Sequence, residues 1–198
     1  TGVYTDTRAL APGCLFVALE GERFDGHEYA SKAVELGAAA VLCEKPCGCG
    51  EKELLVEDTY DALLHLAAWY RGQFSLHVLA VTGSVGKTTT KEMTSAVIAQ
   101  KYRTLKNPGN RNNKIGLPMT LFDLDESYQA AVLEMGMSTR GEIARLSQTA
   151  SPDLGIITNI GLSHIENLGS KENIAKEKFD IVAGMNEQAP LILNADDA

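Results

Sequence analysis

The sequence predicts an α/β fold, with a small N-terminal α/β unit followed by a mostly parallel sheet covered by helices. Three observations predict it. Short apolar segments alternate with helix-like segments along the chain. In the second part the apolar segments are almost uninterrupted, which is typical of parallel strands buried on both faces. A polar, glycine-containing stretch at 72–77 separates the two parts, so we expect domains at 1–75 and 76–198.

The elements of the first part follow from apolar runs and from apolar residues that recur on one side of a helix. In the segment 59–73, residues Leu63, Leu64, Ala67 and Trp69 favour one side. The expected strands of this part are 14–19, 39–43 and 54–56, and its expected helices are 29–36 and 59–73.

The second part alternates strands and helices at the spacing of a nucleotide-binding fold. Its expected strands are 78–81, 130–134, 154–158 and 190–193, and its expected helices are 88–100, 142–147 and 171–183. The polar stretch from Thr104 to Pro118 is expected to be a long loop, either one that reads a substrate or a plain surface loop. Because ligands of such sheets bind at the carboxyl ends of the strands, the residues after each strand are the site candidates.

Composition excludes some classes of function. A net charge of −8 argues against general nucleic-acid binding, which needs a basic surface. No apolar run approaches the ~20 residues that span a bilayer, and the N-terminus does not resemble a signal peptide. We therefore expect a cytoplasmic protein without membrane insertion. We also expect a monomer.

Four cysteines occur, at 14, 43, 47 and 49. The last three could contribute to a zinc site, but their spacing lacks the paired Cys-x-x-Cys arrangement and a fourth ligand would have to come from elsewhere, such as Cys14. We prefer reduced thiols in a surface loop rich in glycine and proline.

The run from Val81 to Thr90 predicts a phosphate-binding loop. It places two glycines and a lysine between an apolar strand and a helix, where free N–H groups face an anion. Lys87 can then reach the terminal phosphates, and the Thr88 hydroxyl can join the ligands of Mg²⁺. The general P-loop formula requires glycine at position 81, where this chain has valine, so an ordinary strand-to-helix turn is the alternative. The candidate phosphate-binding residues are Gly83, Ser84, Val85, Gly86, Lys87, Thr88 and Thr89.

Two polar residues follow other predicted strands. Glu134 ends one strand, where a carboxylate suits Mg²⁺, and His164 follows another. A solvated side chain is the alternative for each. Taken without further information, Lys178 belongs to the charged, exposed face of its helix.

Four segments together resemble the Mur ligase superfamily, and the likeness extends over the whole chain. They are 82–92, 109–118, 134–136 and 159–164. Around Asp6-Thr7-Arg8, Pro12 to Leu19 and Asp25-Gly26-His27, the N-terminal part resembles the family's UDP-binding domain. The resemblance implies an N-terminal UDP-binding domain followed by a P-loop ATP-binding domain.

The resemblance implies an activity as well. Such ligases use ATP to phosphorylate a carboxylate, and an amine then attacks the acyl phosphate to form an amide. The Asn112-Asn113 segment resembles the members that join D-Ala-D-Ala to UDP-MurNAc-tripeptide. Members that add the third amino acid, and folate ligases of the folylpolyglutamate type, are alternatives. A nucleotide-dependent switch is an alternative of another class, although the guanine-reading Asn-Lys-x-Asp pattern is absent.

Roles for single residues also come from the resemblance. Lys87, Glu134, His164 and Lys178 are expected to be catalytic, with Thr88 and Glu134 at one Mg²⁺ and Glu134, His164 and Lys178 at a second. Lys178 is expected to be carbamylated, which converts a cation into an anionic oxygen ligand.

For the substrate, the resemblance implies that Thr7 contacts uracil, that Arg23 lies near the UDP diphosphate, and that Asn112 and Asn113 face the muramoyl peptide. The family's adenine-holding Gly-x-His-Asn-x-x-Asn segment and its C-terminal domain are missing. We therefore expect an incomplete enzyme that turns over poorly by itself.

Overall fold

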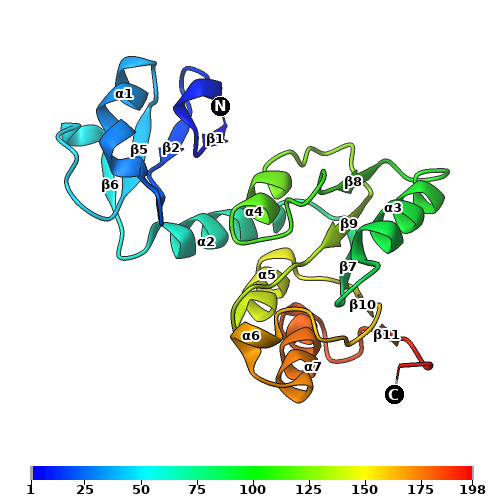
Figure 1. Ribbon diagram of the computed structural model, residues 1–198. Helices are drawn as coiled ribbons and strands as arrows, with labels where there is room; N and C mark the ends of the chain where they lie inside the picture. The colour runs from blue at the N-terminus through cyan, green and yellow to red at the C-terminus, as the bar shows by residue number, and fades with distance from the viewer. Residues whose placement is uncertain (1, 198) are drawn as a thin grey trace. The chain divides into compact units, whose positions relative to one another are not determined.

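The computed structural model describes residues 2–197 (Figure 1). They form two compact units, one that runs to Leu66 and one that begins at Ala67. The division falls within helix α2 (Thr59–Arg71). The functional boundary at 75/76 stays a prediction.

The first unit has a four-stranded parallel sheet in the order β1-β2-β5-β6. Its strands are β1 (Val3–Tyr4), β2 (Leu15–Val17), β5 (Ala40–Cys43) and β6 (Glu53–Leu55), and β3 (Glu20–Gly21) pairs antiparallel with β4 (Phe24–Asp25). Its helical elements are α1 (Ala30–Glu35) and the 3₁₀ turns η1 (Thr7–Ala9), η2 (Gly26–Tyr29) and η3 (Gly50–Lys52). Phe16 and Val41 of the sheet pack with Ala30 and Ala33 in one buried cluster. The expected strands and helices of this part are confirmed within a few residues.

Local contacts explain the Asp25-Gly26-His27 sequence. A Cβ on Gly26 would lie 2.6 Å from the Leu19 carbonyl oxygen, so only glycine fits there. Asp25 Oδ1 accepts from the His27 backbone N–H at 2.9 Å and lies 2.6 Å from Nδ1 of its ring. His27 Nε2 accepts from the Glu44 N–H at 3.0 Å, so the neutral ring carries its proton on Nδ1. These three residues therefore fasten η2 to the end of β5.

The second unit contains a five-stranded sheet in the order β11-β10-β7-β9-β8, in which every pairing is parallel. Its strands are β7 (His77–Thr82), β8 (Thr104–Lys106), β9 (Ala130–Glu134), β10 (Leu154–Ile157) and β11 (Leu191–Leu193). All five residues of β9 are buried. The predicted α/β fold with a parallel sheet is confirmed.

The helices of this unit connect successive strands (Figure 1). They are α3 (Lys87–Ile98), α4 (Gly116–Leu121), α5 (Glu142–Ala150), α6 (Ile165–Leu168), α7 (Lys171–Phe179) and the 3₁₀ turn η4 (Asp180–Gly184). Helix α3 contacts β7, β8 and β9. From β7 the chain goes outward to β8, returns to β9 and then passes to β10 on the other side of β7. The carboxyl end of β7 thus lies at a reversal of strand order, where α/β sheets bind ligands.

Two expectations for this unit were wrong. The stretch 104–118 is not one loop, because Leu105 is buried in a strand that pairs with β9, and helix α4 begins at Gly116. The predicted helix 171–183 ends at Phe179 and continues as η4. There the Ser147 hydroxyl donates to the Ile181 carbonyl and accepts from the Gly184 N–H, which holds the tighter turn.

Among the described residues, no helix is long and apolar enough to cross a membrane.

Candidate functional site

The loop after β7 requires glycine at two positions. Gly83 has φ 147°, and a Cβ there would lie 1.9 Å from Thr158 Oγ1. Gly86 has φ 81° and directly precedes α3. The turn is therefore built by these two glycines, and Val81 lies before it in strand β7.

Residues after β10 hold this loop in place. Asn159 Oδ1 accepts from the N–H groups of Ser84, at 3.1 Å, and Val85, at 2.9 Å. The Thr158 hydroxyl donates to the Val85 carbonyl at 2.6 Å, and Ser84 Oγ accepts from the Gly161 N–H at 2.8 Å. Since Asn159 occupies two N–H groups of the loop, the N–H groups at the start of α3 are the ones left to face an anion.

Lys87 lies over the loop. Its ammonium donates to the carbonyls of Gly83, at 2.8 Å, and Ser84, at 3.3 Å. The side chain is half-buried, whereas Thr88 and Thr89 are exposed. A cation beside a helix N-terminus is the arrangement expected for binding phosphate.

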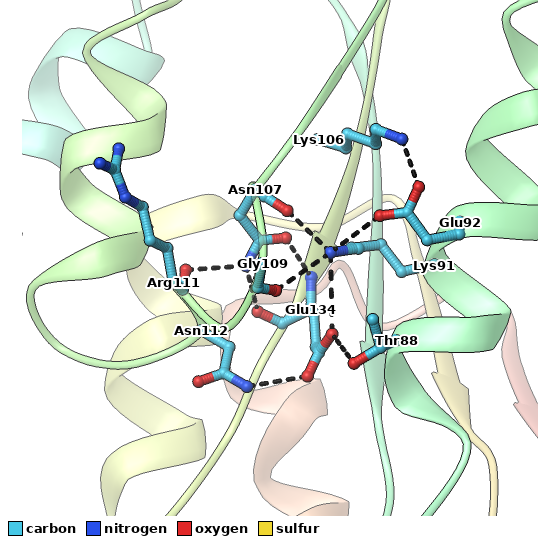
Figure 2. A network of polar contacts seen from close by, with 9 residues as sticks. All are labelled: Thr88, Lys91, Glu92, Lys106, Asn107, Gly109, Arg111, Asn112 and Glu134. Carbon is cyan, nitrogen blue, oxygen red and sulfur yellow. Dashed lines mark hydrogen bonds and ion pairs between the residues drawn. The ribbon is translucent and has the colours of Figure 1, made fainter.

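Glu134 ends β9 next to this loop and is 2% exposed. Its carboxylate accepts from the Thr88 hydroxyl at 2.8 Å and from Asn112 Nδ2 at 2.8 Å (Figure 2). The structure thus brings together the two residues predicted for the first Mg²⁺. A hydroxyl and a carboxylate are hard oxygen ligands, so this donor set fits Mg²⁺.

Asn107 fixes the backbone of Glu134. Its carboxamide accepts from the Glu134 N–H at 2.8 Å and donates to the Glu134 carbonyl at 2.9 Å. It also donates to the Arg111 carbonyl at 2.8 Å. Asn107 lies just after β8, so its side chain continues the pairing of β8 with β9 and makes the position of Glu134 rigid.

Lys178 is buried, with 1% of its surface exposed, so the expectation of an exposed helix face is wrong for this residue. Burial, together with the nearby Lys87 ammonium, lowers its pKa to about 8, while Glu177 acts in the opposite direction. Among the described residues its ammonium has no hydrogen-bond or ion-pair partner. Its neighbour Glu177 accepts from the N–H groups of Gly141, at 2.7 Å, and Ile143, at 3.0 Å, at the start of α5.

His164 does not join these residues. It is exposed, has φ 65° and precedes α6, and in the part of the chain that the structure describes no hydrogen bond or ion pair joins its ring to Glu134 or Lys178. With an unmodified amine at Lys178, the donor set predicted for a second Mg²⁺ does not fit that ion.

The two asparagines of the 104–118 segment have different structural roles. Asn112 reaches the Glu134 carboxylate, and its side chain lies so close to Gly136 that a Cβ there would be 2.9 Å away. Asn113 Oδ1 accepts from the N–H groups of Ile115, at 3.1 Å, and Gly116, at 2.9 Å, and so holds the turn that leads into α4.

The first unit contains a cavity of about 430 Å³. It is lined by Thr5, Asp6, Thr7, Arg8, Phe16, Phe24, Gly26 and Tyr29. Asp6 caps the turn that carries Thr7, and its bonds from Arg8 lower its pKa to about 2. Arg23 is exposed in the turn between β3 and β4 and is not among the residues that line the cavity.

The cysteines do not form a cluster of metal ligands. All four are free, and among the described residues only Glu20, Asp25 and His27 place three such groups within reach of one another. Two of these are already engaged, because Asp25 also accepts from Lys45 at 2.6 Å and His27 Nε2 accepts from the backbone.

Comparison with known protein families assigns the chain. Residues 81–198 match the Mur ligase middle domain, and residues 1–70 match the catalytic domain of the Mur ligase family. The chain belongs to the Mur ligase family.

This Mur ligase chain is 48% identical to the UDP-N-acetylmuramoyl-tripeptide–D-alanyl-D-alanine ligase of Bacillus subtilis, over 99% of the chain and 44% of that protein. A crystal structure of MurF from Acinetobacter baumannii superposes with a TM-score of 0.93 and 38% identity, covering 98% of this chain and 43% of that one. MurF from Thermotoga maritima in complex with ADP gives a TM-score of 0.93 and 37% identity, covering 99% and 46%. The chain therefore spans less than half the length of these relatives.

Sequence reasoning missed several residues of this Mur ligase site. Asn107 and Lys91 hold Glu134, Asn159 holds the loop after β7, and Phe24 and Tyr29 line the cavity. The sequence offered one usable signal for the last two, since they flank the Asp25-Gly26-His27 segment. The others act through contacts between distant segments.

Proposed function

We propose that this chain is the UDP-substrate-binding and nucleotide-binding part of an ATP-dependent ligase that joins D-Ala-D-Ala to UDP-MurNAc-tripeptide. One observation carries the proposal. The Thr88 hydroxyl of the phosphate loop and the Glu134 carboxylate of the neighbouring strand meet at 2.8 Å, in a chain 48% identical to a ligase of that name.

The chemistry follows from the substrates. A carboxylate is a poor electrophile, so its oxygen first takes the γ-phosphoryl group of ATP, giving an acyl phosphate and ADP. The amine of D-Ala-D-Ala then attacks the acyl carbon, phosphate leaves, and the nitrogen loses a proton. Lys87 and the N–H groups at the start of α3 would hold the phosphates and stabilise their charge. Thr88 and Glu134 would hold Mg²⁺, which neutralises phosphate charge when bound.

Carbamylation of Lys178 is part of the proposal. A neutral amine attacks CO₂ to give a carbamate and release a proton, and a pKa of about 8 leaves a substantial neutral fraction near neutral pH. The nearby Lys87 ammonium also favours an anion at this position. The carbamate would supply the oxygen ligand that the amine lacks, and His164 would have to move to join a second Mg²⁺.

Substrate binding is assigned to both units. Thr7 lies in the cavity of the first unit, where Phe24 and Tyr29 offer aromatic faces to a uracil ring. Arg23 near the diphosphate, and Asn112 and Asn113 towards the muramoyl peptide, stay predictions. So do cytoplasmic location and the monomeric state.

The similar ligases favour this substrate over the alternatives. The B. subtilis relative is named as the ligase that joins UDP-N-acetylmuramoyl-tripeptide and D-alanyl-D-alanine. The structures from A. baumannii and T. maritima are named MurF. No specific observation favours a free amino acid, a folate substrate or a nucleotide switch.

Phosphate release tests the proposal. The chain would be joined to the C-terminal part of the B. subtilis relative and given ATP and Mg²⁺, with UDP-MurNAc-tripeptide and D-Ala-D-Ala added singly and together. We expect release only with both substrates, and little release by the 198-residue chain alone. Release that depends instead on a UDP-MurNAc-dipeptide and a free amino acid would contradict the assignment.

A further inference from the structure

Lys91 is a fully buried cation that the proposed chemistry does not use. It lies on α3, one turn after Lys87, and its side chain is 0% exposed. Its ammonium donates to the Asn107 carbonyl at 2.8 Å and to the Gly109 carbonyl at 3.4 Å (Figure 2). Burying a lysine costs free energy unless partners surround its ammonium, so the hydrogen bonds and ion pairs of Lys91 must offset this cost.

Two carboxylates complete the surroundings of Lys91. Glu92 Oε1 lies 3.2 Å from its nitrogen, and Glu134 Oε2 lies 3.9 Å away. The closest contacts of the Lys91 ammonium are therefore the Asn107 and Gly109 carbonyls and the Glu92 carboxylate. The Lys91 ammonium forms an ion pair with the Glu134 carboxylate, whose oxygens accept hydrogen bonds from Thr88 and Asn112.

The contacts form a closed ring that passes through Glu134 (Figure 2). Lys91 joins α3 to the segment 107–109, Asn107 joins that segment to the Glu134 backbone, and Thr88 joins the Glu134 carboxylate back to α3. Without Lys91, the segment 107–112 would lose its attachment to α3. Asn107 and Asn112 would then hold Glu134 less firmly.

We propose that Lys91 is a positioning residue for Glu134, and that it thereby determines how strongly Mg²⁺ increases the affinity of the chain for ATP. This inference rests on the proposed function, because it takes Glu134 as a Mg²⁺ ligand. Lys91 itself contacts neither the phosphate loop carbonyls nor, in the proposal, the nucleotide.

Calorimetric titration of the chain with ATP, once in EDTA and once in Mg²⁺, tests this. The variant is Lys91→Met, which fills similar space without a charge. The control is Lys106→Met. Lys106 also pairs with Glu92, but it is exposed and has no hydrogen bond or ion pair with Glu134 or with the Asn107 and Gly109 carbonyls. We expect the affinity in EDTA to stay within about twofold in all three proteins, since the phosphate loop is intact. The gain from Mg²⁺ should fall about tenfold or more in Lys91→Met alone, as for other residues that orient metal ligands.

Each outcome decides the question. A folded Lys91→Met protein with the full gain from Mg²⁺ would overturn the proposal, even if its melting temperature fell. If Lys91→Met does not fold, Lys91→Gln, which can still donate to the Asn107 carbonyl, is measured by the same criterion. Failure of both to fold would mean that Lys91 serves stability only, which also overturns it. If the wild-type chain binds no ATP under either condition, the proposed function itself fails.

Discussion

At the scale of single residues, Lys178 has the most unusual environment. Burial and the Lys87 ammonium lower its pKa from 10.5 to about 8. An unfolded chain would bind a proton on this amine up to about pH 10.5, whereas the folded chain releases it near pH 8. Between these values the unfolded state binds more protons, so this residue makes stability rise with pH.

Lys178→Met should remove this dependence. From pH 8 to 10.5, the wild-type free energy of unfolding should increase relative to that of the variant, by up to about 1.4 kcal/mol per pH unit. Below pH 8 the difference should be constant, because both states are protonated. Urea unfolding in CO₂-free buffer measures it. A constant difference across the whole range would show that Lys178 has an ordinary pKa.

Carbamylation of the same residue gives a separate residue-scale prediction. Bicarbonate should shift the mass of the intact chain by one CO₂, and Lys178→Met should abolish the shift. Lys176, on the same helix but exposed, gives the control variant Lys176→Met, which should keep it. Native mass spectrometry after dilution into bicarbonate shows the result. A mass shift that survives in Lys178→Met would assign the carbamate elsewhere.

At the scale of elements, the contact between β8 and β9 depends on Asn107. Asn107→Ala would leave the buried Glu134 N–H and carbonyl, and also the Arg111 carbonyl, without this partner. We expect a loss of about 3 kcal/mol in the free energy of unfolding. Asn110→Ala, in the same segment but exposed, should cost less than about 0.5 kcal/mol. Equal effects of the two substitutions in urea unfolding would contradict the role given to Asn107.

Helices and strands could be predicted where the local pattern of apolar residues and glycines determines them. The apolar runs of β7, β9 and β10 and the glycines after β7 carry their own signal, so Lys87, Thr88 and Glu134 could be placed at one edge of a sheet. Short elements held by distant partners could not be predicted. The strand β8 exists because β9 lies beside it, and η4 exists because Ser147 holds its turn.

The site shows the same limit. Charge pattern alone put Lys178 on an exposed face, because nothing in its helix reports what packs against it. Lys91 and Asn159 lie in segments that resemble the family, but the sequence predicts no role for either side chain. Their roles depend on the segments after β8 and β7, which contact them only in the folded sheet.

At the scale of the whole molecule, the proposal assigns the two ligands to different units. Phe24→Ala, in the cavity of the first unit, should weaken binding of UDP-MurNAc-tripeptide about tenfold through lost stacking and leave ATP affinity unchanged. Tyr102→Ala, which changes an aromatic residue outside that cavity, should alter neither affinity. Calorimetry with each ligand would show this, and an unaffected UDP ligand would place its site elsewhere.

The most direct test of the central claim is the affinity of the chain for ATP with and without the phosphate-loop cation. Wild type, Lys87→Met and the exposed control Lys101→Met would be titrated with ATP in Mg²⁺. We predict that the wild type and Lys101→Met bind alike, and that Lys87→Met binds at least about tenfold more weakly because a phosphate loses its cation. Equal binding by all three proteins, or no binding by the wild type, would contradict a nucleotide site at the end of β7.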